Sequence, residues 1–260
     1  MVNANMITAA MIFILGLMIG SFLNVCIYRI PRKESIVFPA SHCPSCGGTI
    51  KFRDNVPVLS YLLLRGRCRF CRARIPFRYP LVELCTAVLL LVLFKNYGLT
   101  VDFFVFGFFT CVLILISAID FEHLLIPNVI IIPSIGIGFV LAFARGYDDL
   151  LKSMAGFAAG GGIILLIAVI SPFLLRQEGI GGGDIKLAGF IGIFLGGFVL
   201  MALFLGFLFG GLVGIALIVG KNKKWKDAVT FGPFLSLGSL VTLFFGANIW
   251  TFYLNLVAMK

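Results

Sequence analysis

The sequence predicts an all-α polytopic membrane protein with about eight transmembrane helices and a small cysteine-bearing domain between the first and the second. Hydrophobic residues make up 60% of the 260 residues and charged residues only 12%, whereas about a quarter of the residues of a soluble domain are charged. Long apolar runs recur along the chain, and one long polar segment carries two Cys-x2-Cys pairs. This composition excludes an ordinary soluble globular protein.

Eight apolar segments are expected to span the membrane, because a spanning helix needs roughly 20 apolar residues. Their approximate limits are 6–28, 81–94, 103–119, 125–144, 153–175, 185–200, 201–220 and 231–255. The sixth and seventh form one apolar run from Leu187 to Gly220. A single helix of that length would measure ~50 Å, too long for one crossing of a ~30 Å hydrocarbon core. We therefore expect the run to break at Gly196-Gly197.

Lys and Arg are distributed unevenly between the two sides of this arrangement. Seventeen of the 21 fall on the side of residues 29–79, and the other side receives Lys95, Arg145, Lys152 and Lys260. Cytoplasmic loops carry the excess of basic residues, so we expect residues 29–79 in the cytoplasm and both termini outside. The same bias and the anionic lipid headgroups explain the basic character of this segment. We therefore expect membrane lipid and no nucleic acid as its partner.

Four of the seven cysteines lie in the polar segment, as Cys43-x2-Cys46 and Cys68-x2-Cys71 with 21 residues between the pairs. Each pair can hold two thiolates on one tight turn, and two such pairs suit a tetrahedral Zn²⁺ site. Two disulfides are the alternative, but the cytoplasm is reducing. A metal would also stabilise a segment with few large apolar side chains. We predict a zinc-binding domain at 29–79, between a first transmembrane helix at 1–28 and a seven-helix membrane domain at 80–260.

Three acidic residues stand out at the ends of predicted spans on the cytoplasmic side: Glu83, Asp120 and Asp184. Ionisable groups at membrane depth are costly, and they indicate function by default. Each also has a structural alternative. Glu83 could pair with one of the nearby arginines, such as Arg78. Asp120 could mark a helix end, and Asp184 could N-cap the helix that follows it.

Asp120 and Asp184 are predicted at the same membrane face on different helices. Two carboxylates that share a site do not both ionise easily, so one holds a proton, and the pair can activate a water and protonate a leaving amine. The glycines before Asp184 would let an extended substrate backbone lie close to it. We interpret the two residues as an aspartic peptidase pair.

The chain resembles the type IV prepilin peptidases, which are GxGD-type membrane aspartic proteases of pilus and type II secretion systems. The resemblance covers nearly the whole length. Besides the cysteine pairs, it rests on GSFLNVCIYRIPR at 20–32, NVPVLSYLLLRGRCRFC at 55–71, RIPFRYPLVEL at 74–84, AIDFEHLLIPN at 118–128, EGIGGGDIKLAG at 178–189 and FGPFLSLGSL at 231–240.

This resemblance implies that Asp120 and Asp184 are catalytic, that Gly181 and Gly183 are the GxGD glycines, and that the four cysteines bind a structural zinc. It implies an endopeptidase at the cytoplasmic face of the bacterial inner membrane, which cleaves the leader peptide of type IV prepilins and pseudopilin precursors after Gly. Long members of the family also methylate the new N-terminal residue with S-adenosylmethionine. The sequence itself shows no Gly-rich cofactor motif, so methylation rests on the resemblance alone.

Two other classes of protein use some of these features. A transporter coupled to protons also has carboxylates in the membrane, but it is expected to show repeated halves with broken helices near the midplane. A membrane scaffold with a zinc module would not require a pair of aspartates.

Overall fold

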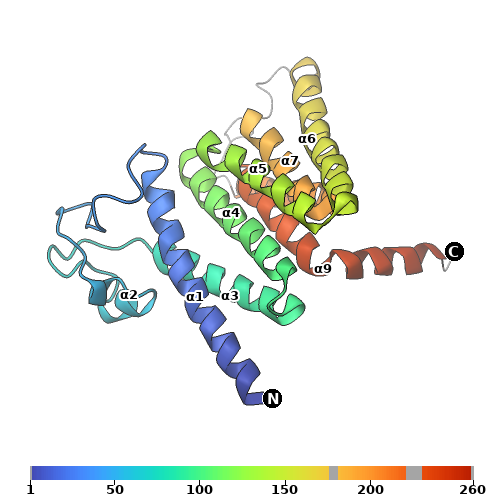
Figure 1. Ribbon diagram of the computed structural model, residues 1–260. Helices are drawn as coiled ribbons and strands as arrows, with labels where there is room; N and C mark the ends of the chain where they lie inside the picture. Colours follow the sequence, from blue (N-terminus) through green and yellow to red (C-terminus); the bar gives the residue numbers. More distant parts are fainter. Residues whose placement is uncertain (1, 176–180, 221–229, 259–260) are drawn as a thin grey trace. The chain divides into compact units, whose positions relative to one another are not determined.

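The computed structural model describes residues 2–175, 181–220 and 230–258, and these residues are mostly helical (Figure 1). Eight long helices are described: α1 (Val2–Arg29), α3 (Arg78–Tyr97), α4 (Val101–His123), α5 (Asn128–Arg145), α6 (Tyr147–Leu175), α7 (Gly182–Leu195), α8 (Val199–Val219) and α9 (Gly232–Ala258). Three short elements complete them: η1 (Phe52–Asp54), α2 (Leu59–Leu63) and η2 (Gly196–Phe198). The described part contains no strand and only two isolated β-bridges. The predicted all-α class is confirmed.

The predicted break in the long apolar run is present. Helix α7 ends at Leu195, Gly196 follows with a φ of 53°, and α8 begins after the short turn η2. By length and composition the described helices give seven candidate spans, because Gly182–Leu217 counts as one. The 14 residues of α7 measure about 21 Å, less than the ~30 Å of a hydrocarbon core. Separate crossings by α7 and α8 therefore stay a prediction.

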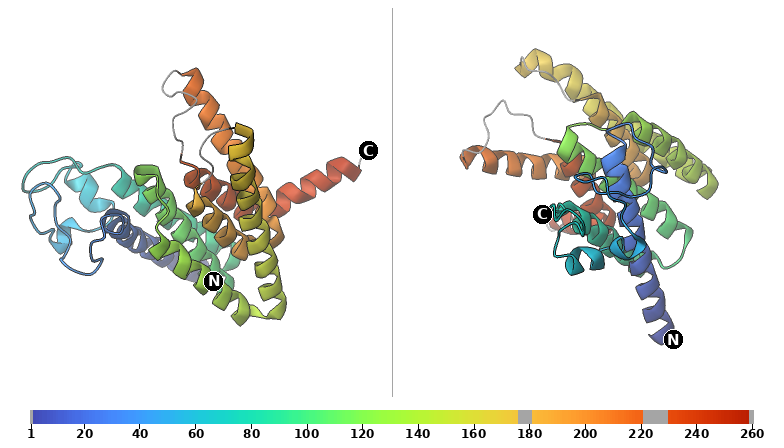
Figure 2. Two further views of the ribbon diagram at one scale, coloured as in Figure 1. Left: turned by 90° about the horizontal axis from the view of Figure 1, so that it is seen from above. Right: turned by 90° about the vertical axis from the view of Figure 1, so that its left-hand side faces the viewer.

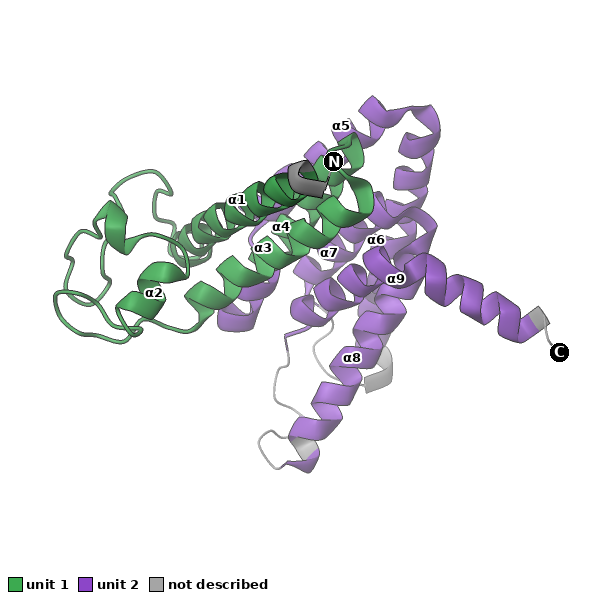
Figure 3. Ribbon diagram, turned by 90° about the horizontal axis from the view of Figure 1, so that it is seen from below, with its two compact units in different colours: residues 1–115 green, residues 116–260 purple. Residues whose placement is uncertain are grey.

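Packing divides the chain into two compact units, residues 1–115 and residues 116–260 (Figure 3). The division falls inside α4, so this helix begins in the first unit and ends in the second. The sequence predicts domain limits after residues 28 and 79, and these rest on the polarity of the chain and on the proposed roles of its parts. Packing does not test them, so they stay a prediction.

In the first unit α1 and α3 lie side by side. A Cβ atom on Gly16 would lie 2.5 Å from the Cα atom of Ala87, and one on Gly20 would lie 2.6 Å from the Cα atom of Glu83. Only glycine permits this approach, and small residues four apart are a common way for membrane helices to pack. The contact fixes the polar end of α3 against α1.

In the second unit α7 is the central helix, packed against α5, α6 and α9 (Figure 2). Every residue from Leu187 to Ile193 is buried. Its closest contact is with α6, where a Cβ atom on Gly156 would lie 2.1 Å from the carbonyl oxygen of Gly192. The burial of α7 holds its first turn in a fixed place, and that turn carries Asp184.

Large apolar side chains are exposed along the long helices; among them are Met11, Phe104, Val140, Phe143 and Phe204, each more than 60% exposed. Exposure of so much apolar surface to water would be unfavourable. Large exposed apolar patches therefore indicate contact with a membrane or with another protein. Together with the seven candidate spans, it shows a membrane protein. The basic residues Arg176, Lys221, Lys223, Lys224 and Lys226, on which the predicted orientation partly depends, lie outside the described residues.

The orientation can be tested with reporter fusions. We expect a reporter fused after Lys226 to lie in the cytoplasm and one fused after Tyr147 to lie outside, because seventeen of the 21 Lys and Arg fall on the predicted cytoplasmic side. Compartment-specific phosphatase and fluorescent reporters measure this directly. The opposite reading at either position would reject the eight-span arrangement.

Candidate functional site

Asp120 lies in the last turn of α4, where its side chain is buried and only 6% of the residue is exposed. Its Oδ2 atom accepts a hydrogen bond of 3.0 Å from the backbone N–H of Gly232, the first residue of α9. Asp120 is thus held between two helices that are far apart in the sequence. The alternative that it only marks a helix end does not account for this contact.

Asp184 is the third residue of α7, and Gly181 is the N-cap. The alternative that Asp184 is the N-cap is therefore wrong. Its carboxylate faces back to the backbone N–H of Gly181, which is the position from which an acidic residue favours a helix start. Asp184 is only half-buried, so its carboxylate keeps access to the surroundings.

Two contacts hold the start of α7 against the α4–α5 connection. A Cβ atom on Gly183 would lie 2.9 Å from the Cβ atom of Ile126, and Lys186 Nζ donates a 2.7 Å hydrogen bond to Asn128 Oδ1. Asp184 lies between these contacts, and its carboxylate is near enough to Asp120 to be affected by the charge of that residue. The structure therefore brings the two predicted aspartates together within the second unit.

The two predicted motif glycines have different surroundings. Gly183 needs to lack a side chain because Ile126 occupies the space that a Cβ atom would take. Gly181 is exposed, and a Cβ atom there would meet only Asp184 Oδ2, at 3.5 Å. Gly181 is thus exposed beside Asp184, and the approach of an extended substrate to these glycines stays a prediction. Residues 176–180, which precede these glycines, lie outside the described residues.

The four predicted metal ligands form one cluster in the first unit. The sulfur atoms of Cys43, Cys46, Cys68 and Cys71 all lie within 4.8 Å of one another, and none of the seven cysteines forms a disulfide. This arrangement can hold a metal ion, with two thiolates from each pair. The alternative of two disulfides is not what the structure shows.

The two cysteine turns repeat the same hydrogen bonds at an offset of 25 residues. Cys43 N donates to Gly48 O at 2.9 Å, and Cys68 N donates to Ala73 O at 2.8 Å. Each turn has a residue with positive φ after its second cysteine, Gly47 in one and Arg72 in the other. Such paired turns present four sulfurs toward a common point, as a tetrahedral zinc site requires.

Electrostatics at the cluster also favour a cation. Hydrogen bonds from the backbone N–H groups of Cys71 and Phe70 lower the pKa of Cys68 to about 7. The pKa of Cys71 is affected first by the backbone N–H of Ala73, which lowers it, but desolvation and the neighbouring sulfurs raise it overall to about 11. Four neighbouring thiolates repel one another, so they form together only around a metal ion.

Glu83 does not take the partner that the sequence suggests. Its carboxylate is buried, and Oε2 accepts a 2.8 Å hydrogen bond from the backbone N–H of Val58 instead of pairing with Arg78. Val58 has a φ of 61°, so this bond stabilises an unusual backbone conformation in the segment that precedes α2. Glu83 therefore connects α3 to the cysteine-bearing segment.

Comparison with known families decides the class of this protein. The sequence model described as the bacterial peptidase A24 N-terminal domain matches residues 14–97, and the one described as the type IV leader peptidase family matches residues 107–215. The chain belongs to the type IV leader peptidase family. The first match contains the four cysteines of the cluster, and the second contains both aspartates. The two sites likewise belong to different compact units of the structure.

Curated relatives agree with this assignment. The chain is 33% identical to a prepilin leader peptidase/N-methyltransferase of Pseudomonas putida over 94% of this chain and 93% of that protein. It is 35% identical to a protein of the same name from Bacillus subtilis, over 95% and 98%. A third, from Myxococcus xanthus, is 37% identical over 72% of this chain, but the match spans 56% of that protein. No solved structure matches the chain.

One residue of the site is not predicted by sequence reasoning. Gly232 belongs to the segment FGPFLSLGSL, which contributes to the family resemblance, but its sequence gives no sign of a contact with a residue 112 positions away. A glycine followed by proline at the start of an apolar run was the available signal.

Proposed function

We propose that this protein is a membrane aspartic endopeptidase that removes the leader peptide of type IV prepilins and pilin-like precursors, and that Asp120 and Asp184 are its catalytic pair. The observation that carries the proposal is the placement of two carboxylates from different helices in one part of the second unit. The family and the names of the relatives support it. They do not favour a transporter or a scaffold without catalysis.

The chemistry requires one carboxylate in each protonation state. The ionised member takes a proton from a water molecule as the water oxygen attacks the scissile carbonyl carbon. The protonated member then gives its proton to the amide nitrogen as the C–N bond breaks, so that the products are a carboxylic acid and an amine. Because Asp120 Oδ2 accepts a hydrogen bond from the Gly232 N–H, we assign the proton exchange to the other carboxylate oxygen, Oδ1.

Gly232 is then a positioning residue, since it orients Asp120 through its backbone. A Cβ atom on Gly232 would lie 2.7 Å from Asp120 Oδ2, which is closer than non-bonded contact allows. We expect Gly232→Ala to displace the carboxylate and lower the rate of leader cleavage by roughly 100-fold, as a misplacement of ~1 Å can do. The rate constant at saturating substrate measures this effect.

Gly214→Ala is the matched control, because a Cβ atom there meets nothing within 4 Å. We expect it to cleave at close to the wild-type rate. Equal rates for Gly232→Ala and Gly214→Ala would remove Gly232 from the site.

The cysteine cluster is proposed to bind one structural Zn²⁺. Its four sulfurs fit the thiolate ligands and the tetrahedral geometry of structural zinc and lie within 4.8 Å of one another. When bound, the metal would hold together a segment that has only short helices, η1 and α2. It would take no part in peptide cleavage.

The first unit is further proposed to support methylation of the new N-terminal amine, with S-adenosylmethionine as the methyl donor. This second activity is part of the names of the relatives, which are called prepilin leader peptidase/N-methyltransferase. In the transfer, the amine lone pair forms the N–CH3 bond, the S–CH3 bond breaks, its electron pair stays on sulfur, and the nitrogen releases a proton to water. We place the protein in the bacterial inner membrane with both sites at the cytoplasmic face.

The proposed function is tested by incubating the purified full-length protein with a pilin-like precursor and S-adenosylmethionine. Mass spectrometry of the product is expected to show cleavage after Gly and one added methyl group on the new N-terminus. An uncleaved precursor would reject the peptidase, whereas a cleaved but unmethylated product would reject only the second activity.

A further inference from the structure

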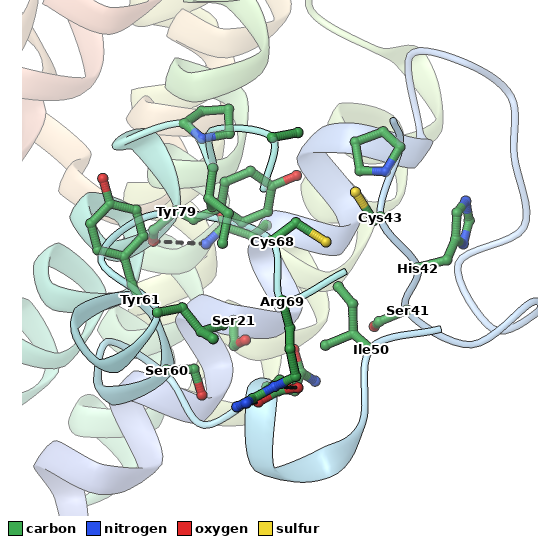
Figure 4. Close-up of a pocket in the computed structure, with 18 of the residues that line it drawn as sticks. Ser21, Ser41, His42, Cys43, Ile50, Ser60, Tyr61, Cys68, Arg69 and Tyr79 are labelled. Atoms are coloured by element: carbon green, nitrogen blue, oxygen red, sulfur yellow. Dashed lines mark hydrogen bonds and ion pairs between the residues drawn. The ribbon is translucent and has the colours of Figure 1, made fainter. Parts of the chain in front are cut away.

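A cavity of about 200 Å³ lies in the first unit, between α1, the start of α3 and the cysteine-bearing segment. Figure 4 shows Ser60 and Tyr61 of α2 at one end and His42 and Cys43 at the other. It is therefore bounded by two membrane helices and by the proposed zinc module. Cys43 and Cys68 of the cluster belong to its wall, but the cavity extends beyond them to residues of α1 and α3.

Glu83 contributes a carboxylate to the wall of this cavity, although the residue is only 6% exposed. The Val58 N–H holds Oε2 at 2.8 Å, and the Ser21 side chain of α1 also hydrogen-bonds the carboxylate. The Cα atom of Glu83 is fixed by its close approach to Gly20. The carboxylate thus has a defined orientation that does not depend on a ligand.

Among the described residues no basic side chain forms an ion pair with Glu83, although three arginines also line the wall: Arg29, Arg69 and Arg74. Arg74 is exposed to water, and the other two have partners. Arg69 forms a two-pronged ion pair with Asp54. The Arg29 guanidinium donates to the backbone carbonyls of Ser35 and Pro39, at 2.8 and 2.7 Å. An unpaired buried charge is costly, so an ionised Glu83 requires a cation that the described residues do not supply.

The remaining walls suit an organic cation better than a metal ion. Tyr61 and Phe70 provide aromatic surface from two different parts of the segment, and aromatic rings attract cations such as ammonium and sulfonium groups. A hard metal ion would need several oxygen ligands, whereas Glu83 is the only carboxylate of the wall that is not already in an ion pair, since Asp54 binds Arg69. The cavity therefore combines one buried carboxylate that has no ion-pair partner, Glu83, with aromatic surface, beside arginines that are exposed or already bound.

We propose that this cavity binds an organic cation against Glu83, as the substrate-binding site of the methyl transfer. The inference rests on the proposed methyltransferase activity, in which both reactants carry the required charge: the methyl donor is a sulfonium and the new N-terminus of the pilin is an ammonium. The cavity is in the first unit and is separate in its residues from the aspartate pair.

The test is the variant Glu83→Gln in the full-length protein. Gln keeps an oxygen that accepts the Val58 N–H but loses the negative charge. The probes are S-adenosylmethionine, its neutral thioether S-adenosylhomocysteine, and a peptide that begins with the free amine of the cleaved pilin. Affinities are measured by calorimetry and the KM for the peptide by methyl transfer. Glu34→Gln, which removes an exposed carboxylate of the same unit, is the control.

If the sulfonium lies against Glu83, the affinity for S-adenosylmethionine falls roughly 10-fold to 100-fold in Glu83→Gln, while that for the neutral thioether stays the same. If the ammonium lies there, the donor affinity stays the same and the KM for the peptide rises by a similar factor. Either result supports the cation site and identifies its occupant, and Glu34→Gln is expected to match wild type throughout.

Affinities and KM within twofold of wild type in Glu83→Gln would overturn the inference, as would a wild-type protein that binds neither probe. Loss of bound zinc in Glu83→Gln would also overturn it, because Glu83 would then act as a support for the cysteine segment. Leader cleavage by the wild-type protein tests the proposed peptidase separately, so its absence would not be mistaken for a failure at Glu83.

Discussion

Asp120→Asn and Asp184→Asn are each expected to lower the rate of leader cleavage by roughly 10²-fold to 10⁴-fold, the usual contribution of a positioned general acid or base. An amide can neither take a proton from water nor give one to the leaving amine, so neither role survives the substitution. The pair is also expected to titrate as a unit, and cleavage should decline on both sides of a pH optimum. Cleavage of a purified precursor, followed over time at several pH values, measures both effects.

Both variants should insert and fold, because Asn has nearly the shape of Asp and its side-chain oxygen can still accept the Gly232 N–H that Asp120 accepts. Glu122→Gln is the control, since Glu122 is an exposed carboxylate two positions from Asp120. Cleavage by Asp120→Asn at the rate of Glu122→Gln would contradict the assignment.

Removing two of the four cysteines is expected to have the largest effect on structure. The protein should bind about one zinc per chain, and Cys43→Ser combined with Cys46→Ser should abolish binding, because two ligands cannot replace the four of a structural site. Structural zinc contributes about 10–16 kcal/mol of binding free energy in small zinc modules. Its loss should therefore unfold much of residues 29–79, while the long helices remain folded in the membrane.

Metal analysis and amide hydrogen exchange measure the two parts of this prediction. Cys85→Ser is the control, because Cys85 lies on α3 outside the cluster, and it should keep its zinc and its protection from exchange. Wild-type protein that contains no zinc and has paired disulfides would reject the metal site.

Much of the fold can be predicted from the sequence because lipid imposes simple rules. The lengths of the apolar runs predict the long helices. The ~30 Å thickness of the hydrocarbon core predicts a break near Gly196, which is the C-cap of α7. The spacing of the cysteines likewise predicts their cluster, because two residues between cysteines fix both sulfurs on one turn. These features are local, and they depend on few residues.

Contacts between distant segments could not be predicted in the same way. The Gly232 N–H reaches Asp120 only because α9 packs beside the end of α4, across 112 positions of sequence. An ion pair of Glu83 with a nearby arginine such as Arg78 was one alternative, but tertiary packing places its carboxylate against the Val58 N–H. Asp184 is also the third residue of α7 and not its N-cap. Gly181, which has extended backbone angles, is the N-cap, so the helix begins earlier than the position of Asp184 suggests.

The most direct measurement of the central claim is the initial rate of leader cleavage by Asp184→Asn, relative to wild-type protein with the same helix content. Asn has nearly the shape of Asp and keeps a side-chain oxygen that can accept the Gly181 N–H, so the substitution removes the proton-transfer group and leaves the local structure. The catalytic pair predicts that cleavage falls by at least 10²-fold. Cleavage at close to the wild-type rate would show that Asp184 serves only the start of α7, and it would contradict the proposed mechanism.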